Sequence, residues 1–145
     1  MMRVVLDTNV LVSAILVPRS IPARILQLIL EGGSTFVISQ DIIDEASRVL
    51  QYPGLVKLMK RNGVTPDELE VVIDQLGKIA VMTPGQYTAD AIKDGPTDNI
   101  FLACAVEGEA DFIISGDRHL TNLKEFQGIT IVNPATFLSI VRREE

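Results

Sequence analysis

Short β-branched runs alternate with longer amphipathic patterns along this chain of 145 residues. The runs are bounded by Gly, Pro, Asp or Asn, as strands commonly are. Strands that are separated by helices pair in parallel through right-handed crossovers, and the helices then cover both faces of the sheet. The pattern therefore predicts a three-layer α/β sandwich. The predicted strands are Arg3–Leu6, Thr35–Ile38, Lys78–Met82, Asp111–Ser115 and Thr130–Val132, and the predicted helices are Pro22–Glu31, Gln40–Leu50, Pro66–Gly77, Asp98–Glu107 and Pro134–Arg142.

The composition is that of one globular unit. The chain is 47% hydrophobic and 22% charged, and we find no repeat, low-complexity tract or linker, so residues 1–145 are expected to form a single domain. Cys104 is the only cysteine, which excludes an internal disulfide and favours a reducing compartment. Asp7 interrupts the apolar N-terminus where a signal core would continue, and no apolar run approaches the ~18 residues of a membrane span. We expect a cytoplasmic protein.

The chain has a net charge of −6, which bears on how it could bind nucleic acid. It argues against a protein that coats nucleic acid through a large basic surface. It is compatible with an enzyme that grips a short stretch of RNA and carries its own cations. Clustered metal-binding carboxylates would also contribute to such an acidic total.

Acidic residues stand where the predicted fold would bring distant segments together. Asp7 and Asp117 each follow a predicted strand, and in open parallel sheets functional groups gather beyond the carboxyl ends of the strands. Asp98 opens the helix that leads into the strand before Asp117. Glu45 lies on the edge of the apolar arc of its helix, from which its carboxylate can reach across the top of the sheet.

Each acid also has a purely structural interpretation. Asp7 and Asp98 could be N-caps, Asp117 could be a turn residue, and Glu45 could pair with Arg48 one turn on. Caps need not converge on one end of a sheet, however, and four converging carboxylates repel one another unless cations lie between them. Oxygen ligands in this number suit Mg²⁺ or Mn²⁺, and one or two such ions support phosphodiester hydrolysis without a nucleophilic side chain.

The order of the motifs resembles that of the PIN-domain family, and in particular its VapC-type toxins from toxin–antitoxin pairs. The opening motif is Val5-Leu6-Asp7-Thr8-Asn9-Val10-Leu11-Val12-Ser13-Ala14. The second acid follows within Ser39–Glu45, and the closing motifs are Asp98-Asn99-Ile100-Phe101-Leu102-Ala103 and Ala110 to Leu120, which contains Ser115-Gly116-Asp117. The resemblance covers nearly the whole chain.

The resemblance implies a PIN-like sheet of five parallel strands in the order 3-2-1-4-5. It implies a Mg²⁺- or Mn²⁺-dependent endonuclease acting on single-stranded RNA, with a cognate antitoxin as partner. Apolar helices leave room for a homodimer as well. The residues at the family's metal-ligand and catalytic positions are Asp7, Glu45, Asp98 and Asp117, and those at supporting polar positions are Thr8, Asn9 and Ser115.

Several other residues have weaker assignments. His119 is the only histidine, and an incidental loop role is favoured over acid–base catalysis. Arg118, Arg19 and Arg24 could contact RNA phosphates or be solvated surface residues. Residues 52–64 could be a helical clip for RNA or a partner, or a solvated connector. Many relatives have Asp-Pro before the third acid, whereas here Gly95 separates Asp94 from Pro96, so no role is assigned to Asp94.

Two further functions remain open from the residues. A receiver-like signalling module also binds Mg²⁺ at strand tips and accepts a phosphoryl group on Asp. It would need a second acid adjacent to Asp7 and a lysine after a late strand, and neither stands there. A non-catalytic PIN relative that binds RNA or a partner without cleaving it is the other alternative, and only an activity assay separates it from a nuclease.

Overall fold

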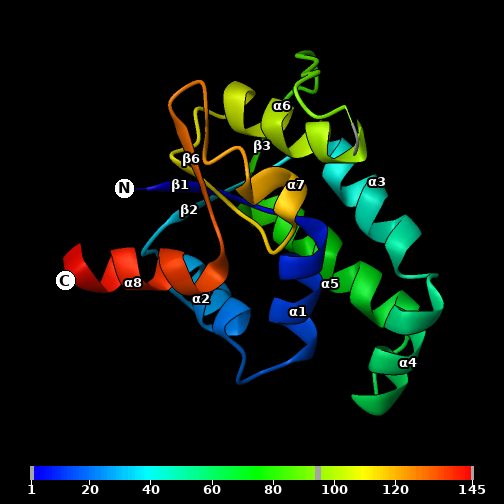
Figure 1. The fold of residues 1–145 in the computed structure, drawn as a ribbon. Coiled ribbons are helices and arrows are strands. Elements are labelled where there is room, and N and C mark those ends of the chain that lie inside the picture. The colour runs from blue at the N-terminus through cyan, green and yellow to red at the C-terminus, as the bar shows by residue number, and fades with distance from the viewer. Residues whose placement is uncertain (1, 94–95, 145) are drawn as a thin grey trace.

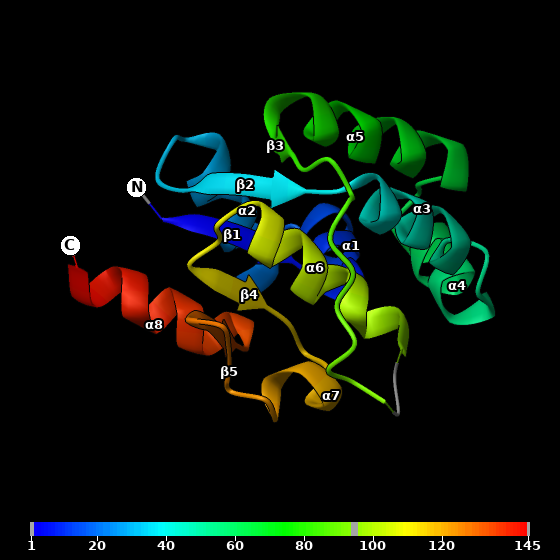
Figure 2. The same cartoon turned by 90° about the horizontal axis from the view of Figure 1, so that it is seen from above.

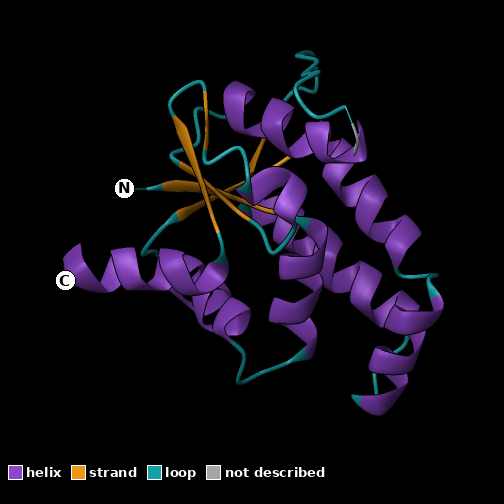
Figure 3. Cartoon of the chain, in the orientation of Figure 1, coloured by secondary structure: helices purple, strands orange, loops and turns teal. Residues whose placement is uncertain are grey.

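A six-stranded sheet forms the centre of the computed structural model, which describes residues 2–93 and 96–144. The strand order is β3-β2-β1-β4-β6-β5, and all neighbours are parallel except β5 and β6. Helices flank the strands on both sides (Figure 3). The strands are β1 Arg3–Leu6, β2 Thr35–Ile38, β3 Val81–Met82, β4 Phe112–Ile114, β5 Glu125–Phe126 and β6 Ile129–Val132.

The five predicted strands lie in the predicted order, and the α/β class is confirmed. The sheet nevertheless has a sixth strand, β5, so the prediction of five strands, all parallel, was wrong in this respect. β5 returns antiparallel onto β6 through Gln127 and Gly128, whose φ angles of 51° and 84° suit a tight hairpin turn. The start predicted for the third strand was also wrong, because helix α5 (Pro66–Ile79) continues through Lys78.

Helices cover both faces of the sheet (Figure 1). α6 lies over one face, while α1, α2 and α8 lie across the other. α3 packs against α1, α5 and α6 near the carboxyl ends of the strands, as the view from above shows (Figure 2). Their bounds are α1 Thr8–Leu16, α2 Ile21–Leu30, α3 Gln40–Val49, α4 Pro53–Arg61, α6 Asn99–Glu107, α7 Arg118–Thr121 and α8 Pro134–Glu144, with a 3₁₀ turn at Pro96–Asp98.

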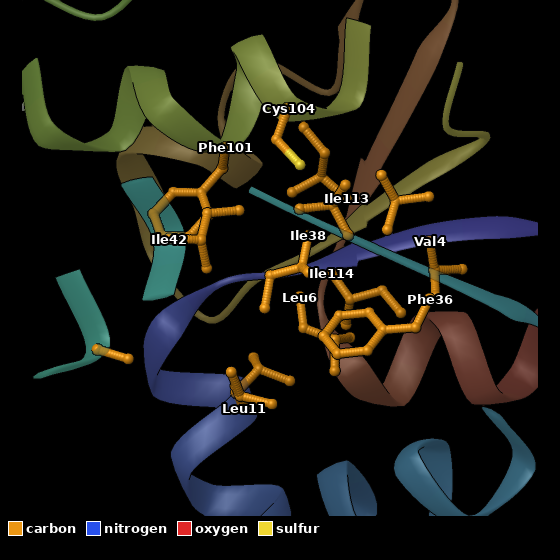
Figure 4. Packing of buried hydrophobic residues seen from close by; sticks show 14 of the residues in the cluster. Val4, Leu6, Leu11, Phe36, Ile38, Ile42, Phe101, Cys104, Ile113 and Ile114 are labelled. Carbon is orange, nitrogen blue, oxygen red and sulfur yellow. The ribbon is translucent and has the colours of Figure 1, made fainter. Parts of the chain in front are cut away.

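The core lies between the two central strands and the helices on either face (Figure 4). Val4, Ile113 and Ile114 are fully buried, so β1 and β4 are apolar on both faces, as central parallel strands usually are. α6 ends close to β2 at Gly108, where an added Cβ would lie 2.3 Å from Val37 Cγ1. This close approach requires glycine at the end of α6.

Within residues 2–93 and 96–144, no single helix has both the length and the hydrophobicity to span a bilayer. The consecutive helices α1 and α2 reach that length and composition only together, with a bend of 88° between them.

Candidate active site

A cleft of about 250 Å³ opens at the carboxyl ends of the central strands. All four acids singled out in the sequence line it, although they come from four separate segments of the chain. Val49 and Phe101 supply apolar wall between the polar groups. The full lining is Asp7, Thr8, Asn9, Glu45, Val49, Tyr52, Thr97, Asp98, Phe101 and Asp117.

Asp7 is fixed from three sides in the connection between β1 and α1. Its backbone N–H donates to Ile114 O at 3.1 Å, which extends the pairing of β1 with β4. Its Oδ1 accepts from the backbone N–H of Val10 at 2.8 Å and so caps α1. Its Oδ2 accepts from the hydroxyl of Ser115. Asp7 is therefore a helix cap and a cleft residue at once, and the two interpretations of this residue do not exclude each other.

Ser115 joins two of the acids. Its buried hydroxyl donates to Asp7 and accepts from the backbone N–H of Asp117 at 2.9 Å. Because β1 and β4 are neighbours in register, the residues that follow them meet at one edge of the sheet. A single hydroxyl can therefore hold the tips of both strands in fixed relation.

Asp98, Asp117 and His119 form the opposite side of the acidic group. Asp117 is the N-cap of α7, and its side chain accepts the backbone N–H of His119 at 2.8 Å. His119 Nδ1 lies 3.5 Å from Asp98 Oδ2 and 3.6 Å from Asp117 Oδ1. Asp98 makes no side-chain cap to α6, so the capping interpretation fails for this residue.

Asn99 fixes the start of α6, directly after Asp98. Its side-chain oxygen accepts from the backbone N–H groups of Ala91 and Ile92, and its amide donates to Ile92 O at 2.9 Å. Three hydrogen bonds thus tie this buried residue to the preceding segment. Asp94 itself lies outside the described residues.

Glu45 is less firmly held. It projects from α3 and its side chain is 15% exposed, and it pairs with Arg48 on the same helix. Glu45 therefore both forms the intrahelical pair with Arg48 and lines the cleft. Arg48 is largely exposed, and exposed pairs of this kind contribute little free energy.

None of the described residues that line the cleft is basic; Arg48 and His119 reach its acids from outside the lining. Burial raises the pKa of Asp7, and the negative charge of Asp117 adds to this, against the lowering effect of the Ser115 and Val10 hydrogen bonds. Burial and then the charge of Asp117 also raise the pKa of Asp98, while His119 opposes the rise. A cation between these two carboxyl groups would favour their charged forms and so oppose the rise in their pKa values.

This has a testable consequence for stability without divalent ions. A carboxyl group whose pKa is higher in the folded than in the unfolded chain stabilises the fold fully below its unfolded value, near 3.8, and this stabilisation is lost as the pH rises through the folded value. Asp7→Asn stays neutral throughout. We therefore expect this variant to melt at a higher temperature than the wild type at pH 7 in EDTA, with the difference shrinking toward pH 4. Thermal melts across that range measure it, and a constant or negative difference would contradict the cause given.

The donor groups fit a hard divalent ion. The cleft offers carboxylate oxygens, and Thr8 adds a buried hydroxyl that has no hydrogen-bond partner among the described residues. A buried hydroxyl without a partner is unfavourable, so a ligand in the cleft or its hydration shell would be expected to satisfy it. Oxygen donors of this kind suit Mg²⁺ or Mn²⁺.

The other predicted residues are placed differently. Thr8 and Asn9 line the cleft, and Arg118 is exposed beside Asp117 without forming part of the lining. Arg19 and Arg24 do not line the cleft, since Arg19 lies between α1 and α2 and Arg24 borders a separate hollow between α2 and α8.

Sequence reasoning did not identify Tyr52, Thr97 or Phe101 as part of the cleft and gave His119 an incidental role. Phe101 follows Asp98 by three residues, and this spacing places both on one side of a helix. Its position in the cleft could therefore have been predicted from the sequence.

Comparisons with known proteins place the chain in a known family. Residues 3–119 match the family described as PIN domain. An uncharacterized protein of Methanocaldococcus jannaschii is 29% identical over 123 residues, which cover 85% of this chain and 76% of that protein. In the crystal structure of VapBC2 from Rickettsia felis bound to a DNA fragment from their promoter, one chain matches with a TM-score of 0.57 and 14% identity, covering 91% of this chain and 98% of that one. The family match spans most of the chain and includes all four cleft acids, and the chain belongs to the PIN domain family.

Proposed function

We propose that this protein is a Mg²⁺- or Mn²⁺-dependent endoribonuclease that hydrolyses phosphodiester bonds of single-stranded RNA in the cytoplasm. The observation that carries the proposal is the convergence of Asp7, Glu45, Asp98 and Asp117 on one cleft, with raised pKa values at Asp7 and Asp98. PIN-family membership supports nuclease chemistry in such a cleft. In this proposal the four carboxylates are the metal ligands and catalytic residues.

The chain's own groups would then divide the work. Asp7, Glu45, Asp98 and Asp117 would hold the divalent ion, which when bound would supply polarisation of a phosphate oxygen and activation of water at neutral pH. Ser115 keeps the Asp7 carboxylate oriented. Thr8 and Asn9 line the cleft from the same connection, and the Thr8 hydroxyl, which has no partner among the described residues, is available there to a ligand and is not bonded to the acids. Tyr52 is 56% exposed at the cleft, where its ring offers a face on which an unpaired base can stack. Arg118 is the nearest candidate for a phosphate contact, since it adjoins Asp117, whereas Arg19 and Arg24 would need an RNA that extends well beyond the cleft.

We also propose that the protein is the toxin of a toxin–antitoxin pair. The support is the likeness of fold to a chain of VapBC2, together with the PIN-family match. The cognate antitoxin would be its protein partner, and pairing with a second copy of the chain is a further possibility within this proposal.

The direct test is cleavage of a fluorescently labelled single-stranded RNA by purified protein. We expect cleavage with Mn²⁺ or Mg²⁺, complete loss in excess EDTA, and recovery when Mn²⁺ is restored, because the carboxylates need a cation to act on a phosphate. The same oligonucleotide in a duplex is the substrate control. Full activity in excess EDTA would contradict the proposal, and binding of the RNA without any cleavage would favour a non-catalytic relative.

A further inference from the structure

The His119 ring lies beside two carboxylates of the site without being part of the core. Its side chain is 51% exposed, so it does not contribute to the core. Its backbone N–H donates to the Asp117 side chain, so the turn has this hydrogen bond whatever side chain stands at position 119. The ring nevertheless turns Nδ1 toward two carboxylates that come from different parts of the chain, Asp98 before α6 and Asp117 at the start of α7.

These three groups lie close enough together to be ligands of one ion. A ligand atom from each of Asp98, Asp117 and His119 lies within 4.8 Å of the other two. Donor atoms about 2.1 Å from a common ion lie about 3.0–3.5 Å apart when they are adjacent in its coordination shell. The distances from Nδ1 to the two carboxylates, 3.5 and 3.6 Å, are close to this range.

A second observation points to a ligand in the cleft, which Asp98 and Asp117 line and which His119 borders through its contacts with these two acids. Thr8 is 6% exposed and lines the cleft, and its hydroxyl oxygen finds no hydrogen-bond partner among the residues that the structure describes. This atom is independent of the acidic cluster, and its buried hydroxyl would be satisfied by an ion's hydration shell or by a bound phosphate.

We propose that His119 ligates the catalytic ion through Nδ1, together with Asp98 and Asp117, and that it thereby biases the cleft toward first-row transition ions over Mg²⁺. The inference rests on the proposed function only in requiring that the cleft binds a divalent cation. Imidazole nitrogen is a ligand that transition ions accept readily, whereas Mg²⁺ strongly prefers oxygen. A site with nitrogen and oxygen ligands therefore favours transition ions over Mg²⁺ more strongly than a site made only of carboxylates does.

The first experiment measures selectivity by calorimetry, with Co²⁺ and Mg²⁺ as probes on the full chain. In His119→Gln we expect the affinity for Co²⁺ to fall by about tenfold or more, while the affinity for Mg²⁺ changes by less than about twofold. Lys78→Gln is the matched control, because it alters an exposed basic side chain at the end of α5 that does not line the cleft. It should leave the ratio of the two affinities unchanged. Equal losses for both ions in His119→Gln, or no loss for either, would overturn the inference.

The second experiment needs no variant. Because the chain has one histidine, its ring nitrogen signals in a ¹⁵N NMR spectrum belong to His119 without further assignment. We expect Zn²⁺, a diamagnetic transition ion, to shift the Nδ1 signal into the range of a metal-bound imidazole, and Mg²⁺ to leave it nearly unchanged. Zn²⁺ binding without this shift would overturn the role of His119 and leave the metal site standing. Failure of every ion to bind would overturn both this inference and the proposed function.

Discussion

Replacing Asp7 with asparagine is expected to lower the rate of RNA cleavage by about 10²-fold or more, because it removes a preorganised charge from the centre of the site. Asparagine keeps the shape of the side chain and can still accept from the Val10 N–H, so the cap of α1 is retained. The loss should therefore fall on activity and not on folding. Single-turnover cleavage in Mn²⁺ measures the rate, and circular dichroism checks the fold.

Asp111→Asn is the matched control for that variant. It makes the same chemical change at the other end of β4, where the exposed Asp111 accepts the backbone N–H of Arg3. We expect it to cleave RNA at close to the wild-type rate. Wild-type activity in Asp7→Asn, or an equal loss in both variants, would show that the cleft carboxylate does not have the role assigned to it.

Replacing Phe137 with alanine is expected to lower the free energy of unfolding by about 3–5 kcal/mol. Phe137 is 1% exposed and fixes α8 against the sheet, where its ring meets that of Phe112 edge-on with centroids 5.3 Å apart. The variant would lose this aromatic contact and leave a cavity under α8. Urea denaturation followed by circular dichroism measures the change.

Phe137→Leu provides the comparison, because leucine keeps most of the apolar volume. We expect it to lose much less stability, under about 1.5 kcal/mol. If alanine and leucine cost the same, the ring is not packed as described, and α8 contributes to the fold in some other way.

The central part of the site could be predicted because topology leaves few choices. Parallel strands separated by helices place all their carboxyl ends at one edge, so residues that directly follow β1 and β4 had to meet if those strands were neighbours. Asp7 and Asp117 do so. For Glu45 the helical pattern placed the carboxylate at the edge of the apolar face, and the structure puts it at the cleft. Its pairing with Arg48 is a question of side-chain rotamers, which a pattern cannot decide.

The elements that were missed lack periodic signals. α1 is apolar nearly throughout, and six of its nine residues are buried, so no polar face marks it as a helix. β5 has two residues, too few to show alternation. α4 lies in the segment 52–64 that was left open between a helical clip and a connector; it is helical, and its contact with RNA or a partner stays a prediction.

His119 was undervalued for a different reason. The role inferred for it depends on two contacts of its ring. One is with Asp98, which lies 21 positions earlier in the chain, and the other is with Asp117 across a short turn. Neither relation can be read from a single loop sequence. Lone histidines in loops are usually incidental, and only the three-dimensional arrangement distinguishes this one.

The most direct test of the account is a crystal structure of the protein soaked in Mn²⁺, with the ion located by its anomalous scattering. We expect a peak in the cleft within bonding distance, about 2.2 Å, of carboxylate oxygens that include those of Asp98 and Asp117. A cleft without an anomalous peak at millimolar Mn²⁺, with each carboxylate turned to its own helix end, would contradict it.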